Sequence, residues 1–147
     1  MTVNIRPARA EDAERCAELL QLLQGAVGEA LSGGAQAVLA DLLTGARGEV
    51  LVAEEDGLLL GLAAVSYNLA MRYGGEYCQL EELIVDPAAR GKNAGGLLVQ
   101  ASITRARERG CAEYGLYLVA TTEHNLPFYE KYGLERVGSE LRMRLNQ

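Results

Sequence analysis

The residues best suited to chemistry lie in one stretch, where an apolar segment passes through a basic, glycine-containing loop into a helical pattern. The stretch reads Val85-Asp86-Pro87-Ala88-Ala89-Arg90-Gly91-Lys92-Asn93-Ala94-Gly95-Gly96-Leu97-Leu98. The first N–H groups of a helix have no partner within it, and the helix dipole favours an anion in front of them. Small residues at 91 and 95 let a phosphate approach the backbone, and two cations, Arg90 and Lys92, stand beside them.

This loop matches neither the Walker A pattern nor the dinucleotide fingerprint, which opens an N-terminal βαβ unit. An ordinary strand–loop–helix connection with solvated charges is the alternative. The strand–loop–helix context favours a phosphate site over that alternative.

Two adjacent carboxylates, Glu81 and Glu82, directly precede the apolar segment Leu83-Ile84-Val85. Side chains alternate along a strand, so we expect them on opposite faces, one toward a cleft and one toward solvent or a cation. An alkylammonium has a pKa near ~10.4, so at neutral pH it must lose a proton before its nitrogen can attack. Either glutamate could bind or deprotonate such an amine; the alternative is that both merely border the sheet.

Tyr129 is the candidate general acid. A phenol, with a pKa of about 10, can protonate a departing thiolate whose conjugate acid lies near 8.5. The alternative role is packing of a short helix. His124 is the single histidine, and its place in a loop before a helix favours a surface or capping role over a catalytic one.

The periodicity of apolar residues predicts a mixed α/β sheet with helices on its faces, formed by one domain over 1–147. Asp56-Gly57 between two apolar runs predicts a hairpin turn. The segment 83–85 is predicted to be buried on both faces. Expected strands are 3–6, 49–54, 58–67, 76–85 and 116–120; expected helices are 12–24, 35–43, 94–109 and 125–133; a closing hairpin is expected at 134–137 and 140–145.

Composition excludes several classes of function. The net charge of −6 disfavours nucleic-acid binding. No apolar run is long enough for a membrane span and no secretory signal is visible, so a cytoplasmic protein is expected. The three cysteines form no Cys/His cluster, which predicts neither a metal site nor a disulfide framework, but small buried side chains.

Two motifs in this order resemble those of the GNAT superfamily of N-acetyltransferases. The first is R/Q-x-x-G-x-G/A after a V-x-P strand end, where Arg90 takes the first position, Asn93 replaces the glycine of the fourth position and Gly95 fills the last. Asparagine is the non-glycine residue most able to adopt the left-handed conformation. The second is F-Y-x-K-x-G-F, seen here as Phe128-Tyr129-Glu130-Lys131-Tyr132-Gly133-Leu134. The R-G-x-N-x-G variant also looks like the aminoalkylphosphonate N-acetyltransferase branch.

The resemblance implies a GNAT-like fold with a splayed pair of parallel strands and acetyl-CoA as co-substrate in the notch. The strand residues Leu83, Ile84 and Val85 would offer backbone to the pantetheine arm and the thioester. The amides of Arg90, Gly91, Lys92, Asn93, Ala94, Gly95 and Gly96 would hold the pyrophosphate. The family's pantetheine-binding asparagine corresponds here to Thr122, so Asn125 would substitute for it or the contact would be absent.

The implied activity is transfer of an acetyl group to a primary amine of a small molecule, by direct attack in a ternary complex. The helices 12–24 and 35–43 would shape the acceptor site. The segment Tyr67–Tyr77 either lines that site or forms a homodimer contact. The alternatives are a protein lysine or N-terminal acetyltransferase and a non-catalytic acyl-CoA sensor.

Overall fold

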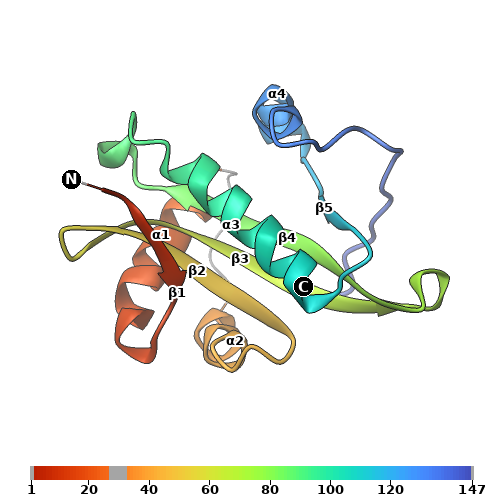
Figure 1. Cartoon of the computed structure of the whole chain (residues 1–147), viewed down its shortest axis with the longest axis horizontal. Coiled ribbons are helices and arrows are strands. Elements are labelled where there is room, and N and C mark those ends of the chain that lie inside the picture. The colour runs from red at the N-terminus through yellow and green to blue at the C-terminus, as the bar shows by residue number, and fades with distance from the viewer. Residues whose placement is uncertain (1, 27–32, 147) are drawn as a thin grey trace. The chain divides into compact units, whose positions relative to one another are not determined.

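The computed structural model describes residues 2–26 and 33–146 and forms two compact units, one up to Leu116 and one from Tyr117. The first unit contains β1 (Asn4–Pro7), α1 (Ala13–Ala26), α2 (Ala35–Leu42), β2 (Gly48–Glu55), β3 (Leu58–Ala70), β4 (Gly75–Val85), α3 (Ala94–Arg109) and β5 (Tyr114–Leu116) (Figure 1). The second contains a 3₁₀ segment, Ala120–Asn125, and α4 (Leu126–Glu130). That the whole chain forms a single domain stays a prediction.

The sheet of the first unit is mixed, as predicted. Its five strands lie in the order β1-β2-β3-β4-β5, with antiparallel pairs up to β4 and a parallel pair between β4 and β5. The parallel ladder joins Cys78–Leu80 to Tyr114–Leu116 and ends there. The end of β4 therefore runs on to Val85 without pairing to β5.

Helices cover both faces of this sheet, as Figure 1 shows for α3 on one face and for α1 and α2 on the other. The core under α1 and α2 is apolar and takes alternate strand residues. Its members are Cys16, Leu19, Leu39, Val50, Val52, Leu59, Leu62 and Ala64. Because side chains alternate along a strand, the intervening residues Leu51, Ala53, Ala63 and Val65 face α3, and they are also buried.

The turn between β2 and β3 has the predicted chemistry. Asp56 has φ 53° and Gly57 has φ 80°, the two positive angles that a tight hairpin turn of this kind requires. The turn prediction is confirmed.

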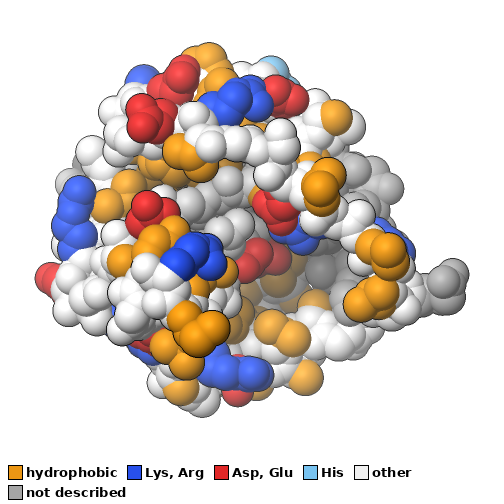
Figure 2. Space-filling model, turned by 90° about the vertical axis from the view of Figure 1, so that its right-hand side faces the viewer, with side chains coloured by type: hydrophobic (Ala, Val, Ile, Leu, Met, Phe, Trp, Pro, Cys, Tyr) orange, Lys and Arg blue, Asp and Glu red, His pale blue; other side chains and the backbone are white. Residues whose placement is uncertain are grey.

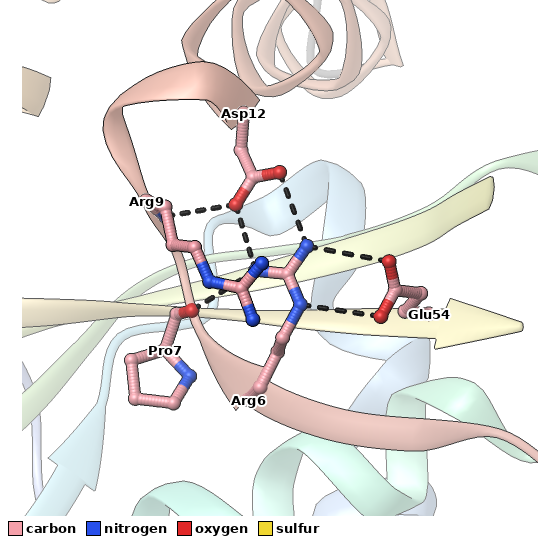
Figure 3. Close-up of polar contacts among 5 residues, drawn as sticks. All are labelled: Arg6, Pro7, Arg9, Asp12 and Glu54. Atoms are coloured by element: carbon pink, nitrogen blue, oxygen red, sulfur yellow. Dashed lines mark hydrogen bonds and ion pairs between the residues drawn. The ribbon is translucent and has the colours of Figure 1, made fainter. Parts of the chain in front are cut away.

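A guanidinium network anchors β1 (Figure 3). Arg6 donates to both carboxylate oxygens of Asp12, at 2.8 and 3.1 Å, and its Nε donates to Glu54 on β2 at 3.2 Å. Asp12 also accepts from the backbone N–H of Arg9 at 2.8 Å. Arg6 is the strongest cause holding the pKa of the Asp12 carboxyl below its usual range.

Three sequence predictions about strands are wrong. The fifth strand covers Tyr114–Leu116 rather than 116–120, and in the described part of the chain no strand follows Leu116, so the hairpin at 134–137 and 140–145 is not formed. The segment 83–85 is half-buried rather than buried on both faces. Alternating apolar residues show which segments could be strands, but a strand also needs a partner edge elsewhere in the chain.

Candidate active site

A β-bulge interrupts the pairing of β3 with β4 at the two adjacent glutamates. Val65 pairs with Leu80 and Ala64 pairs with Glu82, so Glu81 is an extra residue on β4. Paired residues of neighbouring strands share a face of the sheet. Glu82 therefore lies on the face of Ala64, which is the face covered by α1 and α2.

Glu81 lies on this same face. Its Oε2 accepts a hydrogen bond from Ser66 Oγ at 2.6 Å, and Ser66 shares a face with Ala64, two residues before it. Ser66 Oγ is also contacted by Asn68 Nδ2 at 3.0 Å. The prediction that the two glutamates point to opposite faces is wrong, because the extra residue of a bulge breaks the alternation.

The two carboxylates differ in their surroundings. Glu81 is exposed and held by Ser66, whereas Glu82 is half-buried and no described side chain donates to it. Burial, and after it the negative charge of Glu81, raises the pKa of Glu82 to about 7. A carboxyl that titrates near neutral pH can accept a proton from a neighbouring group at that pH.

The basic loop begins with a short capped turn. Asp86 Oδ1 accepts from the backbone N–H of Ala88 at 2.9 Å, which caps the 3₁₀ turn Pro87–Ala89. The chain then reaches Gly91, with φ +89°, and Asn93, with φ 58° and ψ 26°. Asn93 thus adopts the left-handed conformation expected for the residue that replaces the glycine at the fourth position of the motif.

Helix α3 starts directly after this loop and leaves donors at its tip. The Asn93 side chain makes no capping hydrogen bond, and the first of the helical main-chain bonds runs from Leu97 N–H to the Asn93 carbonyl at 3.0 Å. The amides of residues 94–96 belong to the turn that has no partner within the helix. The loop residues 90–93 are exposed, so an anion has access to them.

The two cations of the loop are held differently. Lys92 Nζ contacts Glu55 Oε1, at the end of β2, at 2.7 Å. Arg90 is exposed and makes no ion pair within the described residues. Arg90 is thus the cation that is available to a ligand without breaking an existing pair.

The apolar end of β4 runs between the carboxylates and this loop. Leu83, Ile84 and Val85 pair with β3 at Ala63, Leu62 and Gly61. A Cβ on Gly61 would lie 2.5 Å from the Ile84 carbonyl oxygen, so only glycine permits this approach of the strands. On its other edge this part of β4 has no pairing with β5.

Three of the predicted residues, Thr122, Asn125 and Tyr129, belong to the second unit. Tyr129, on α4, is buried, which raises the pKa of its phenol, and its ring meets Phe128 edge-on with centroids 5.0 Å apart. Asn125 precedes α4, but its side chain makes no cap. The hydroxyl of Thr122 donates to the Val119 carbonyl at 3.2 Å.

Sequence reasoning missed Arg15, Ser66 and the capping role of Asp86. Ser66 gives no local signal, because its partner is fifteen residues away on another strand. Arg15 does give one. A cation in the first turn of a helix opposes the helix dipole, which suggests that an acidic partner lies nearby.

The cysteines carry no chemistry in this site. Cys16 and Cys78 are buried, Cys111 is half-buried, and all three are free. Burial raises the pKa of the Cys16 thiol to about 11 and that of Cys78 to about 12, which keeps both protonated. Among the described residues, no three His, Cys, Asp or Glu side chains are grouped so that they could hold a metal ion.

Two further features of the described chain bear on partners. No helix in it is long and apolar enough to cross a membrane. On the face drawn in Figure 2, lysine and arginine side chains lie among acidic and hydrophobic ones and form no continuous basic surface.

Known proteins resemble this chain over most of its length. The sequence profile of the Acetyltransferase (GNAT) family matches residues 16–134. An uncharacterized N-acetyltransferase of Bacillus subtilis, YhfO, is 30% identical over 138 residues, 90% of each chain. A glucosamine 6-phosphate N-acetyltransferase of Trypanosoma brucei brucei is 29% identical over 118 residues, 78% of each chain. The crystal structure of a Trypanosoma brucei acetyltransferase superposes with a TM-score of 0.78 at 28% identity, covering 97% of this chain and 99% of that one.

Proposed function

This chain belongs to the Acetyltransferase (GNAT) family and is an acyltransferase, and from that premise we propose that it transfers the acetyl group of acetyl-CoA to a primary amine of a small molecule. The observation that carries the proposal is the loop 90–96, which turns through two left-handed residues and presents the uncapped start of α3. The relative named for glucosamine 6-phosphate acts on a small amine, which favours a small-molecule acceptor.

The donor site follows from this loop. The amides of residues 90–96 and the cation of Arg90 bind the diphosphate of the donor. The edge of β4 at residues 83–85, beyond the β5 ladder, pairs with the pantetheine arm and directs a backbone N–H at the carbonyl oxygen of the thioester. Asn125 is the candidate second contact for the pantetheine arm, because the hydroxyl proton of Thr122 is already given to a main-chain carbonyl.

The reaction is a direct acyl transfer within a ternary complex. Glu82 takes a proton from the ammonium, directly or through water, and the amine nitrogen then attacks the thioester carbon. The C–N bond forms, the C–S bond breaks, and the Tyr129 phenol gives its proton to the departing thiolate. The nitrogen then loses its second proton, through water, to the Tyr129 phenolate, which leaves a neutral amide and restores the phenol, and Glu82 releases its proton to solvent. Burial raises the pKa of Tyr129, so the phenol holds this proton at neutral pH. The Glu81 carboxylate, next to Glu82 in the chain, attracts the cationic acceptor.

The donor assignment is tested by titrating the protein with acetyl-CoA and following backbone amide signals. We expect the signals of residues 90–96 to move on binding. Acetyl-pantetheine, which has the same thioester but no diphosphate, is the matched control and should leave these amides in place. Saturating acetyl-CoA without any change in these signals would refute the proposal.

The reaction is tested by following thiol release from acetyl-CoA with a panel of small amines. Tyr129→Phe should bind acetyl-CoA as the wild type does and release thiol roughly 10²- to 10⁴-fold more slowly. An unchanged rate at all pH values would remove the general-acid role. Acetylated lysines or N-termini in a cell extract, without turnover of small amines, would favour a protein acetyltransferase; tight donor binding without any acceptor would favour a sensor.

Three finer predictions remain open to simple experiments. Cell fractionation tests the cytoplasmic location, and light scattering tests the homodimer. Neither of the two relatives described above carries a name that refers to aminoalkylphosphonates. The resemblance to the aminoalkylphosphonate N-acetyltransferase branch is tested by including an aminoalkylphosphonate in the amine panel.

A further inference from the structure

An arginine on α1 holds the strand end from which the donor loop departs. Arg15 Nη2 donates to Asp86 Oδ2 at 2.7 Å, across 71 residues of sequence. The same guanidinium donates to the Leu59 carbonyl through Nε at 3.2 Å and through Nη2 at 3.1 Å. One side chain thus fastens the ends of two strands, β3 and β4.

Asp86 passes this constraint to the loop. While Oδ2 binds Arg15, Oδ1 accepts from the Ala88 N–H at 2.9 Å, and the Asp86 N–H donates to the Leu60 carbonyl at 2.8 Å. The Asp86 carbonyl accepts from the Ala89 N–H at 2.8 Å. The direction of the turn that leads to Arg90 therefore depends on how the Asp86 side chain is held.

The place of Arg15 supports a dedicated role. It lies in the first turn of α1, where the helix dipole disfavours a cation, and the pair with Asp86 offsets that cost. The Leu59 carbonyl, to which Arg15 donates, lies at a second bulge of the sheet, where Ala53 and Glu54 of β2 pair with Gly61 and Leu59 of β3. Arg15 also raises the fraction of ionised Asp86, because its hydrogen bond is the largest cause lowering the pKa of that carboxyl.

We propose that Arg15 is a positioning residue for the donor site, which acts through Asp86 to fix the turn that presents the amides of residues 90–96. This inference rests on the proposed function of that loop. Arg15 touches neither donor nor acceptor in this scheme. Loss of the Arg15 side chain should weaken acetyl-CoA binding. Proton transfer to Glu82 should proceed at its usual rate in those molecules that have bound acetyl-CoA.

The experiment measures acetyl-CoA affinity and steady-state rates for Arg15→Gln, Asp86→Asn and the double variant. We expect each single variant to raise Kd and KM for acetyl-CoA roughly three- to thirtyfold, the double variant to be little worse than either, and kcat to stay within about twofold. Arg15→Lys keeps the positive charge beside Asp86, so its affinity for acetyl-CoA should be higher than that of Arg15→Gln. It should stay below that of the wild type, because lysine cannot hold Asp86 and Leu59 together.

The matched control is the ion pair between Arg105 on α3 and Glu49 on β2. Arg105 Nε donates to Glu49 Oε1 at 2.9 Å, and the Arg105 side chain is 40% exposed against 34% for Arg15. Arg105→Gln should lower the melting temperature as Arg15→Gln does, yet leave Kd for acetyl-CoA unchanged. A control variant with the same loss of affinity would show a general loss of stability and overturn the inference.

A second readout keeps the positioning role open to test without any ligand. In the free protein, Arg15→Gln should shift the amide signals of residues 88–93, whereas Arg105→Gln should not. Equal affinity for acetyl-CoA in Arg15→Gln and in the wild type would overturn this inference but leave the proposed function standing. A wild type that binds no acetyl-CoA overturns the proposed function and this inference with it.

Discussion

Two groups of acidic side chains on the same sheet show opposite uses of charge. At the β1 end, Asp12 and Glu54 both meet the guanidinium of Arg6, and the pKa of Asp12 is lowered. At the β4 bulge, Glu82 is half-buried next to Glu81, no cation among the described residues pairs with it, and its pKa is raised to about 7. A paired carboxylate stabilises the fold, while an unpaired one costs stability and gains the ability to exchange a proton near neutral pH.

The largest expected effect is on the catalytic rate, after substitution of the unpaired carboxylate Glu82. Glu82→Gln keeps the shape of the side chain but removes the base, so kcat should fall roughly 10²- to 10⁴-fold. In the wild type, kcat/KM should rise with pH up to about 7 and then level off, because only the ionised carboxylate accepts a proton. A pH series with an amine acceptor measures both. A variant with the wild-type rate and profile would assign the base elsewhere.

The next effect concerns stability at the other end of the sheet. Asp12→Ala removes one partner of the ion pair with Arg6, whose side chains are only 12% and 10% exposed, and should cost about 3 kcal/mol of unfolding free energy. Denaturant unfolding at neutral pH measures this loss. Because the pKa of Asp12 is lowered in the folded state, its contribution is present at neutral pH and disappears as pH falls through the acid range, so the variant and the wild type should converge there. The rate per folded molecule should not change.

Glu82→Gln should change the free energy of unfolding in the opposite direction to Asp12→Ala. The folded-state pKa of Glu82 is about 7, above the ordinary value of 4.5, so its ionisation disfavours the folded state as pH rises through that range. Removing the charge should therefore raise the stability at pH 8 by about 1–3 kcal/mol and leave it nearly unchanged at pH 4. A loss of stability at pH 8 would mean that the carboxylate has a favourable partner.

The smallest effect separates the two causes of the raised pKa. Glu81→Gln removes the neighbouring negative charge, so the acidic limb of the pH–rate profile should move to lower pH. The shift should be less than about one pH unit, because burial, which is the larger cause, remains. Ser66→Ala leaves the Glu81 carboxylate in the chain and serves as the control. The acidic limb of its pH–rate profile should stay close to that of the wild type.

The sequence predicted the backbone conformation of the loop 90–96 well, because that conformation is local. Gly91 and Asn93 are residue types that accept positive φ, and the structure places both there. The Asp56-Gly57 turn was predictable for the same reason. In each case two or three neighbouring residues determine the backbone.

What the sequence did not predict depends on pairs that are distant along the chain. The faces of Glu81 and Glu82 are decided by how β4 aligns with β3, and the bulge between them has no signature in the residues of β4 alone. The Arg15–Asp86 contact joins a helix to a strand end that lies 71 residues later. The expected strands at 134–137 and 140–145 had the right alternation, but alternation does not specify a partner.

The extra residue of the β4 bulge has a consequence for comparing and engineering such chains. Pairing before it runs from Leu80 to Val65 and pairing after it resumes from Glu82 to Ala64, with no position of β3 skipped. A one-codon deletion of Glu81 would therefore leave every other side chain of β4 on its present face and the core intact. Between homologous sequences, a single-residue gap at this point changes the bend of the strand and the number of acidic groups beside Glu82, while the hydrophobic interior stays in phase.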